Sequence, residues 1–332
     1  MEKKLKILII RFSAMGDIIY TTPVIRCLKN QLPNCEIHYL TKPNFKYLLE
    51  YNPYLDHLHL LDSSLSNTIT QLKKERFDVV IDLHSSLRSA IVKLRLGIKS
   101  STYNKERFKK WLAIKYKINW VAPVHLVDRY LKTVEFLGVK NDHQPIDYFL
   151  PNNDFKIEDF LPPHFSDNYI AFVIGAAHFT KRMPNSKVIS ILQKTNLSVV
   201  LLGGKDVAEN GIEIANACKK VINLCDKISL NQSVFLIKNA KKVIGFDTGL
   251  THIAEAFDKE LLSIWGSTIP ELLGVQPYLL TKHYEAGVNL ACRPCSKFGL
   301  AACPLGHFNC MYEIDEEPIT QFLNDEKEIT DH

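Results

Sequence analysis

The sequence lacks any apolar run long enough to cross a membrane. Its longest apolar stretches, such as LSVVLLGG over residues 197–204, have the length of a β-strand, whereas a membrane-spanning helix needs about 20 residues. The N-terminal segment MEKKLKILII has too short an apolar part for a secretory signal and no small-residue cleavage site, so it is predicted to form a first strand. We therefore expect a cytoplasmic protein.

Two glycine-rich nucleotide-binding signatures are also missing. No strand-to-helix turn carries the GxGxxG fingerprint of dinucleotide-binding enzymes or the GxxxxGK[ST] motif of P-loop NTPases. A nicotinamide-dependent oxidoreductase and a P-loop NTPase thus lose their main support. Several turns in the second half, with small residues and a nearby cation, still suit a nucleotide diphosphate, because backbone N–H groups and helix dipoles attract anions.

The sequence does contain a sustained alternation of short β-branched runs and helix-length segments. This alternation predicts an α/β fold with doubly wound parallel sheets covered by helices. With 332 residues the chain suits two domains of roughly 150 residues each. The polar, proline-containing stretch 147–168 is the expected linker, which gives an N-terminal domain over 1–152 and a C-terminal domain over 153–332. Strands are expected at 5–11, 35–40, 57–61, 77–83, 98–103, 169–175, 197–203, 221–225, 242–247 and 260–266, with helices at 23–32 and 230–240 among others.

Positive charge is concentrated in one segment. The chain has 41 Lys and Arg against 36 Asp and Glu, a net charge of +5, but residues 88–117 hold ten Lys or Arg and a single acid, Glu106. Aromatic side chains, including Phe108, Trp111 and Tyr116, are interleaved with these cations. Such a segment is typical of a solvated helical face, or of a surface that binds an anionic membrane, a phosphorylated lipid or nucleic acid. The residues alone leave these alternatives open.

One carboxylate lies at a turn where a phosphate-binding backbone is usual. The stretch ILIIRFSAMGDIIYTTP over 7–23 begins as a buried strand and ends as a helix, with Asp17 between them. In a doubly wound fold that turn lies at the ligand-binding edge of the sheet. A carboxylate in a partly dry site can accept the proton of an attacking hydroxyl, so Asp17 is a candidate general base.

The motif FDTGLTHIAEAF over 246–257 has the pattern of a strand end, a turn and a helix. The helix argues against an aspartic protease, which needs an all-β setting and a second carboxylate. In one interpretation Asp247 accepts hydrogen bonds from sugar hydroxyls, while the N–H groups of Thr248 and Gly249 face a phosphate. In the other, these residues only cap the helix.

Two cations follow another predicted strand. In HFTKRMP, Lys181 and Arg182 come after the strand at 169–175, at the edge where such sheets bind ligands. They are candidates for neutralising a diphosphate, although any surface loop can carry two cations.

These motifs together resemble glycosyltransferase family 9, the lipopolysaccharide heptosyltransferases. The resemblance rests on RFSAMGDIIYTTPVIRCLKNQLPNCEIHYL and VIGFDTGLTHIAEAFDKELLSIWGST, and it extends through FDVVIDLHSSLRSA, HLVDRYLKTVEFLG and CRPCSKFGLAACPLGHFNCM over nearly the whole chain. It implies a GT-B fold, in which two Rossmann-like domains face each other across a cleft, the first binding the acceptor and the second the nucleotide sugar. It also implies transfer of L-glycero-D-manno-heptose from ADP-heptose to the lipopolysaccharide inner core, with inversion of the anomeric centre and without a metal ion.

The resemblance also implies roles for individual residues. Asp17 matches the general base that deprotonates the acceptor hydroxyl. Lys181 matches the cation at the nucleotide phosphates, with Arg182 as the neighbouring candidate. For His252 the alternative is a packed helix residue without contact to the donor. The donor-binding residues implied by the match are Lys181, Arg182, Asp247, Thr248, Gly249, Leu250 and His252.

The basic segment acquires a use from the same resemblance, because the acceptor of this family is a phosphorylated, acidic lipid. We expect residues 88–117, placed in the acceptor-binding half, to contact acceptor phosphates or the cytoplasmic surface of the inner membrane. The expected partners are thus a nucleotide sugar, a phosphorylated glycolipid and that membrane surface, with no nucleic acid and no required cofactor. The last helix of the chain is expected to pack back on the N-terminal domain. The candidate acceptor-binding residues are Ser13, Arg88, Arg107, Lys109 and Lys110.

Two other functions are compatible with the sequence. The first is a GT-B-fold transferase or epimerase that uses a different nucleotide sugar, because function depends on the site rather than on the fold. The second is a non-catalytic protein that binds anionic membranes through the basic segment. The second would not need Asp17 or Asp247, whereas a transferase needs both.

Four of the eight cysteines are clustered near the C-terminus. Cys292, Cys295, Cys303 and Cys310 have the spacing C-x2-C-x7-C-x6-C, which in a cytosolic protein suggests a structural zinc before a disulfide. His307 could replace one of them as a ligand. Reduced or occasionally paired thiols are the other interpretation. The remaining cysteines, Cys27, Cys35, Cys218 and Cys225, fall within predicted regular elements and are expected to be small buried hydrophobic residues.

Overall fold

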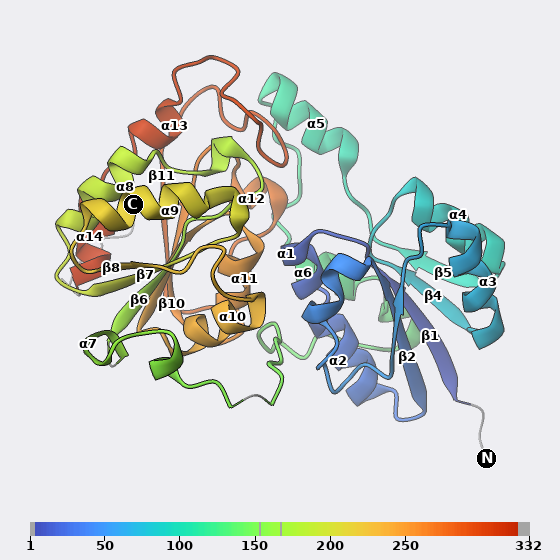
Figure 1. The fold of residues 1–332 in the computed structure, drawn as a ribbon. Coiled ribbons are helices and arrows are strands. Elements are labelled where there is room, and N and C mark those ends of the chain that lie inside the picture. The colour runs from blue at the N-terminus through green and yellow to red at the C-terminus, as the bar shows by residue number, and fades with distance from the viewer. Residues whose placement is uncertain (1–3, 153, 167, 325–332) are drawn as a thin grey trace. The chain divides into compact units, whose positions relative to one another are not determined.

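The structure is a computed structural model that describes residues 4–152, 154–166 and 168–324 (Figure 1). Residues 153 and 167 of the predicted linker and residues 325–332 of the predicted second domain lie outside the described part. Contacts divide the chain into two compact units. Unit 1 comprises residues 1–107, 122–151 and 274–279, and unit 2 comprises residues 108–121, 152–273 and 280–332.

Unit 1 contains a five-stranded parallel sheet in the order β3-β2-β1-β4-β5. Its central strand, β1, has the sequence LKILII and is buried from Ile7 to Ile10, which is why an uninterrupted apolar run occurs there. The strands are β1 (Leu5–Ile10), β2 (Cys35–Thr41), β3 (His57–Leu60), β4 (Val79–Asp82) and β5 (Lys99–Thr102). The helices are α1 (Met15–Ile19), α2 (Thr22–Gln31), α3 (Leu65–Glu75), α4 (Leu87–Leu96) and α6 (Leu126–Leu131), with 3-10 turns at Pro43–Leu48 and Glu135–Leu137.

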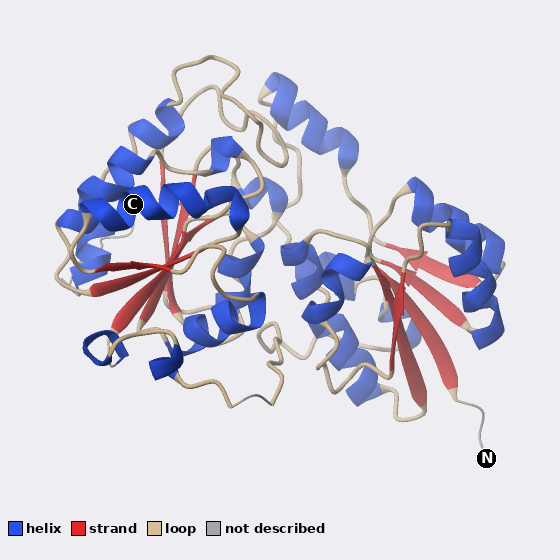
Figure 2. Cartoon of the chain, viewed as in Figure 1, coloured by secondary structure: helices blue, strands red, loops and turns tan. Residues whose placement is uncertain are grey.

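Unit 2 contains a six-stranded parallel sheet in the order β11-β10-β9-β6-β7-β8. Ile170 and Phe172 of its strand β6 pack into one core cluster, while Tyr169, Ala171 and Val173 pack into another. Both faces are therefore buried, and helices cover both (Figure 2). The strands are β6 (Tyr169–Val173), β7 (Ser198–Leu202), β8 (Val221–Asn223), β9 (Lys242–Phe246), β10 (Glu260–Trp265) and β11 (His283–Gly287). The helices are α5 (Arg107–Tyr116), α7 (Pro163–Ser166), α8 (Asn185–Gln193), α9 (Ala208–Ala217), α10 (Leu230–Asn239), α11 (Gly249–Glu255), α12 (Pro270–Leu273), α13 (Asn309–Tyr312) and α14 (Glu317–Asn324), with 3-10 turns at Ile157–Asp159, Phe179–Lys181 and Lys205–Val207.

The α/β class and the ten predicted strands are confirmed, and no strand end is displaced by more than two residues. The helices predicted at 23–32 and 230–240 correspond to α2 and α10. Strand β11 was not predicted. Its sequence HYEAG contains no β-branched residue and only one buried side chain, because it lies at the edge of the sheet. No described helix has both the length and the apolar character that crossing a membrane requires.

Two segments belong to a different unit from the residues that flank them in the chain. Residues 274–279 belong to unit 1, where the amide of Leu126 donates to the carbonyl of Gly274 at 2.7 Å. Residues 108–121 belong to unit 2, where Lys117 Nζ donates to the carbonyls of Cys292 and Pro294 at 2.9 and 2.8 Å. Helix α5 accordingly lies beside the loop that leads to α13 (Figure 1). The expectation that the whole basic segment belongs to the N-terminal half is therefore wrong for this helix.

The last described helix, α14, belongs to unit 2. Its apolar residues Ile319, Phe322 and Leu323 join the unit 2 core. Its position is reinforced by Lys242 of β9, whose Nζ donates to the carbonyl of Phe322 at 2.7 Å. The amphipathic pattern of this helix shows that it must pack on a sheet, but it does not show on which one.

Candidate active site

Asp17 lies in the short helix α1, at the carboxyl edge of β1. The guanidinium of Arg11, the residue after β1, forms an ion pair with Asp17 and donates a hydrogen bond to the carbonyl of Leu83 at 2.6 Å. The amide of Ala14 also donates to Asp17 Oδ2, at 3.3 Å. The Arg11 side chain is 5% exposed, whereas that of Asp17 is 28% exposed. Asp17 is thus a carboxylate held in position by a buried cation while remaining accessible to solvent.

Aromatic side chains surround Arg11. Its guanidinium carbon lies 5.8 Å from the centre of the Tyr130 ring, and Tyr39 and Tyr103 are also buried in its neighbourhood. Burial acts to lower the pKa of Arg11. The interactions with Asp17 and with these tyrosines together outweigh burial, so the pKa of Arg11 is raised. Arg11 is therefore a permanent cation beside the candidate base.

His84 is a third residue of this sheet edge that the sequence analysis missed. It follows β4, which pairs with β1, and its ring makes an edge contact with Phe12 at 4.9 Å between ring centres. Burial lowers the pKa of His84 to about 4, and the positive charges of Arg11 and Lys105 add to this effect. Its Nδ1 atom is buried and has no hydrogen-bond partner among the described residues. His84 is thus a neutral, half-buried imidazole in the electrostatic neighbourhood of Asp17 and Arg11.

In unit 2 the structure brings Lys181 and Asp247 together. Lys181 follows β6 and Asp247 follows β9, and these strands are neighbours in the sheet. The distance from Lys181 Nζ to Asp247 Oδ2 is 2.5 Å, and Thr268 Oγ1 donates to the same oxygen at 3.0 Å. Both side chains of the ion pair are about nine-tenths buried. Burial acts to raise the pKa of Asp247, but Lys181 and His252 hold it well below its usual range.

His252 extends this cluster into helix α11. Its Nε2 lies 3.6 Å from Asp247 Oδ1, and its Nδ1 lies 2.9 Å from Oε1 of the fully buried Glu255. Burial acts to lower the pKa of His252, but hydrogen bonds to the two carboxylates raise it to about 9. The cluster therefore pairs two cations, Lys181 and His252, with two anions, Asp247 and Glu255. The charges are desolvated, balanced and fixed in position.

The other predicted donor-binding residues are placed differently. Thr248 is the extended residue that precedes α11, Gly249 is the first residue of that helix, and Leu250 packs partly buried against the core. The Arg182 guanidinium is directed elsewhere, because it forms an ion pair with Asp206 and its Nε donates to the carbonyl of Ala176 at 2.8 Å. Lys181, and not Arg182, is therefore the cation that contacts Asp247.

The predicted acceptor-binding residues are divided between the two units. Ser13 is half-buried near Asp17, and Arg88 is exposed at the start of α4 in unit 1. The exposed Arg107 donates to the carbonyl of Ser85. Lys109 is exposed on α5, whereas Lys110 is only 6% exposed and its Nζ lies 3.4 Å from the carbonyl of Leu273. Lys110 is thus a packed residue of unit 2, and its role as an acceptor ligand stays a prediction.

The cysteine-bearing loop packs on the turn that carries Lys181. The amide of Cys295 donates to the carbonyl of Ser267 at 3.0 Å, and the amide of Leu300 donates to Thr180 Oγ1 at 2.8 Å. Burial acts to raise the pKa of Cys303, but the amides of residues 305–308 surround its sulfur and lower it. All eight cysteines are free thiols, and Cys27, Cys35, Cys218 and Cys225 are buried as expected. Among the described residues, the sulfur atoms of Cys292, Cys295, Cys303 and Cys310 do not converge into a metal-binding group, so their positions do not support a structural zinc there.

Comparison with known proteins relates this chain to heptosyltransferases. The sequence model of glycosyltransferase family 9 (heptosyltransferase) matches residues 66–301. Lipopolysaccharide heptosyltransferase 1 of Campylobacter coli is 26% identical over 290 residues, which cover 80% of this chain and 84% of that relative. The structure of E. coli ADP-heptose lps heptosyltransferase II is similar with a TM-score of 0.71 at 20% identity, over 96% of this chain and 98% of the other. E. coli heptosyltransferase WaaC with ADP-2-deoxy-2-fluoro heptose gives a TM-score of 0.65 at 18% identity, over 96% and 98% of the two chains.

The two doubly wound units and these structural similarities define the fold as the GT-B fold of the heptosyltransferase structures. Because the family match covers most of its length, the chain belongs to glycosyltransferase family 9 (heptosyltransferase). The expectations of a GT-B fold, a transferase and a heptosyltransferase of lipopolysaccharide synthesis are confirmed.

Proposed function

We propose that this enzyme transfers heptose from ADP-heptose to a phosphorylated glycolipid of the lipopolysaccharide inner core, with inversion at the anomeric carbon. Family membership and the names of its relatives support the sugar and the pathway, and the ADP-heptose in the name of a solved neighbour supports the donor. The observation that carries the chemistry is the partly exposed carboxylate of Asp17, oriented by the buried Arg11.

In the proposed reaction Asp17 accepts the proton of the acceptor hydroxyl. The oxygen then attacks the anomeric carbon from the face opposite the leaving group, so the configuration inverts. The bond from that carbon to the diphosphate oxygen breaks, and its electron pair leaves with ADP. An anomeric carbon with oxocarbenium character needs a nucleophile whose proton is removed as the bond forms, which is the work of a general base.

The charge that develops on the leaving diphosphate is assigned to the unit 2 cluster. Lys181 is fixed by Asp247, and His252 is kept protonated by Asp247 and Glu255. Preorganised cations in a desolvated site stabilise developing negative charge without reorganising during the reaction. This proposal requires no metal ion, because Lys181 and His252 supply the positive charge. Asp247 and the N–H groups that begin α11 would hold sugar hydroxyls and phosphate.

Helix α5 is the proposed contact with the cytoplasmic surface of the inner membrane. Phe108, Trp111 and Tyr116 are 67%, 46% and 52% exposed, and the Phe108 and Trp111 rings stack with centres 5.9 Å apart. Lys115 Nζ lies 5.4 Å from the centre of the Trp111 ring. Exposed aromatic rings beside lysines suit the boundary between anionic headgroups and acyl chains.

The test is the substitution Asp17→Asn, with ADP release and glycolipid product measured alongside ADP-heptose binding by calorimetry. Loss of a general base is expected to lower turnover by a factor of roughly 100 to 10,000, while donor affinity changes little. Asp226→Asn is the matched control, because Asp226 is exposed in unit 2 and its left-handed backbone tolerates Asn. Turnover of Asp17→Asn close to that of the wild type would refute Asp17 as the base.

The identity of the donor is tested separately by thermal shift across nucleotide sugars. A donor that binds only the folded protein raises the melting temperature, and at equal concentration the tighter donor gives the larger rise. ADP-heptose is expected to give the largest shift. A larger shift with another nucleotide sugar would assign the enzyme to the alternative of a different donor while leaving the GT-B class intact.

A further inference from the structure

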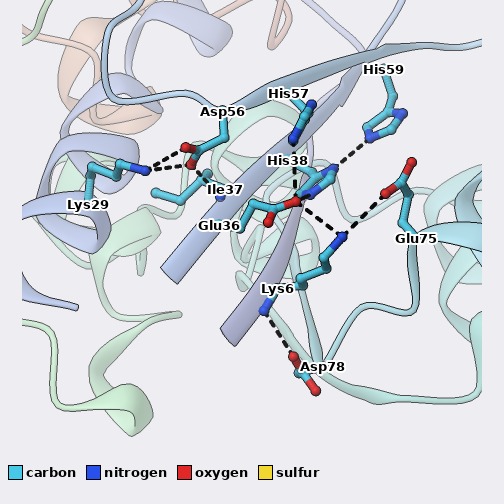
Figure 3. Close-up of polar contacts among 10 residues, drawn as sticks. All are labelled: Lys6, Lys29, Glu36, Ile37, His38, Asp56, His57, His59, Glu75 and Asp78. Atoms are coloured by element: carbon cyan, nitrogen blue, oxygen red, sulfur yellow. Dashed lines mark hydrogen bonds and ion pairs between the residues drawn. The ribbon is translucent and has the colours of Figure 1, made fainter. Parts of the chain in front are cut away.

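We propose that Glu36, His38 and His57 bind one divalent transition-metal ion, such as Zn²⁺, on the sheet of unit 1. One ligand atom from each of these residues lies within 4.8 Å of the other two, and no other set of three such residues does so in the described part of the chain. Figure 3 shows Glu36 and the His38 and His57 rings converging from strands β2 and β3. Two imidazoles and one carboxylate are a ligand set that zinc and its neighbours in the first transition row prefer.

The register of the sheet creates this group. His38 of β2 is paired with His57 of β3, so the two side chains lie next to each other on one face. Glu36 is two residues before His38 on the same strand and therefore shares that face. The rings of His38 and His57 are stacked, with centres 4.4 Å apart. Because the three groups come from two regular strands, their positions are set by backbone hydrogen bonds.

The distances between the ligand atoms agree with coordination of one ion. Glu36 Oε1 lies 2.8 Å from His38 Nε2 and 3.4 Å from His57 Nε2. Ligand atoms held about 2.1 Å from a tetrahedral ion are separated by roughly 3.4 Å, so the Glu36–His57 distance already fits, and the Glu36–His38 distance would have to lengthen by about 0.6 Å. His38 is buried and His57 is 55% exposed, which gives an ion a route from solvent and leaves room for water as a further ligand.

His59 is the hydrogen-bond partner of the other ring nitrogen of His38. Its Nε2 lies 2.8 Å from His38 Nδ1, on the side of the ring opposite Glu36. With Glu36 able only to accept, His38 donates from Nε2 and its Nδ1 accepts from His59. When His38 Nε2 binds a metal, the proton of the neutral ring resides on Nδ1. His38 then donates the hydrogen bond to His59 Nε2 instead of accepting it. Metal-bound histidines commonly have such a partner on the other ring nitrogen, which fixes the ring and its tautomer.

Lys6 also forms an ion pair with Glu36. It is paired with Glu36 in the sheet, and its Nζ lies 3.1 Å from Glu36 Oε1. The same ammonium is 3.5 Å from Glu75 Oε2, so it has a second carboxylate to which it can move (Figure 3). A metal ion would therefore compete with Lys6 for Glu36. This competition makes a prediction that a merely structural histidine cluster does not make.

The expected consequence of metal binding is structural. The site joins edge strand β3 to β2 on the face of the sheet, rather than at the carboxyl edge that carries Asp17. Ligands from two strands would hold the edge strand β3 against β2. The free energy of unfolding should therefore rise with the metal concentration by mass action.

The experiment uses the full-length protein after chelator treatment, titrated with Zn²⁺ or Co²⁺ alone. We expect one ion per chain by calorimetry, a Co²⁺ absorption spectrum typical of mixed nitrogen and oxygen ligands, and a rise in melting temperature. His57→Ala removes an exposed ligand and should weaken binding by roughly 10- to 100-fold or more. Lys6→Met removes the competing cation and should tighten binding. His164→Ala is the matched control, because His164 is exposed in unit 2.

Three results would overturn the proposal. The first is the absence of metal binding in both wild type and Lys6→Met. The second is binding that His57→Ala leaves unchanged. The third is binding abolished by Cys303→Ser but retained in His57→Ala, which would place the ion on the cysteine loop instead. None of these readouts depends on transferase activity, so the proposed function stands or fails independently.

Discussion

The two candidate site regions handle charge in opposite ways. In unit 1 the cation Arg11 is buried and its partner Asp17 is more than a quarter exposed. In unit 2 Lys181, Asp247, His252 and Glu255 are all nearly buried, and their charges balance. A group that must receive a proton from substrate has to be reachable, whereas groups that stabilise charge act most strongly when water is excluded. The difference in burial thus distinguishes Asp17, which is suited to accept a proton, from the unit 2 cluster, which is suited to stabilise charge.

The variant expected to lower turnover most, second only to Asp17→Asn, is Lys181→Ala. Loss of one preorganised cation should lower turnover by roughly 100-fold or more and weaken ADP-heptose binding, in contrast to Asp17→Asn, which spares binding. The measurement is kcat and KM together with donor affinity by calorimetry. Lys181→Arg keeps the charge and should recover part of the loss. Lys205→Ala, at an exposed lysine of the same unit, serves as control. A Lys181→Ala enzyme with normal donor affinity would contradict the assignment.

The buried histidine provides a pH test of the same cluster. The folded-state pKa of His252, about 9, lies above its ordinary value of 6.5, so protonated His252 stabilises the folded protein fully below about pH 6.5. That contribution is lost as the pH rises from 6.5 through 9. We expect the unfolding free energy of the wild type, measured by urea titration, to fall over this interval relative to His252→Gln. Parallel pH profiles for the two proteins would show that His252 is not charged in the folded state.

The smallest effect is expected at helix α5. Phe108→Ala combined with Trp111→Ala removes two exposed rings and should weaken binding to vesicles containing anionic lipid several-fold, without changing donor binding. Binding is measured by vesicle sedimentation at two salt concentrations, because the lysine contribution is screened by salt. Phe136→Ala, at another exposed aromatic residue in unit 1, is the control. Equal binding of the double variant and the wild type would remove α5 as the membrane contact.

Much of the fold and part of the site could be predicted from local sequence. Strand-to-helix turns placed Asp17, Lys181 and Asp247 at sheet edges, because parallel strands end on one side. Arg11 lies within the stretch that identified Asp17, and Glu255 is three residues after His252, a spacing that places both on one helix face. The Arg11–Asp17 pair was not predicted because an ion pair across a turn depends on backbone geometry, and the His252–Glu255 pair was not predicted because the spacing alone does not show that both side chains are buried. The burial of Lys110 and the assignment of α5 to unit 2 depend on contacts with residues more than 150 positions away, which no local pattern indicates.

The exchanged segments 108–121 and 274–279 have a consequence for how this enzyme can be divided. Following the chain from one end to the other, the backbone passes from one unit to the other five times, after residues 107, 121, 151, 273 and 279. A cut at residue 152 would leave helix α5, which belongs to unit 2, in the first fragment. That fragment would also lack residues 274–279, which accept the hydrogen bond from the Leu126 amide. Separate expression of the halves, or exchange of one half with that of a relative, would therefore have to transfer several discontinuous pieces together. The sequence is ordered in two halves, but its folding units are interleaved.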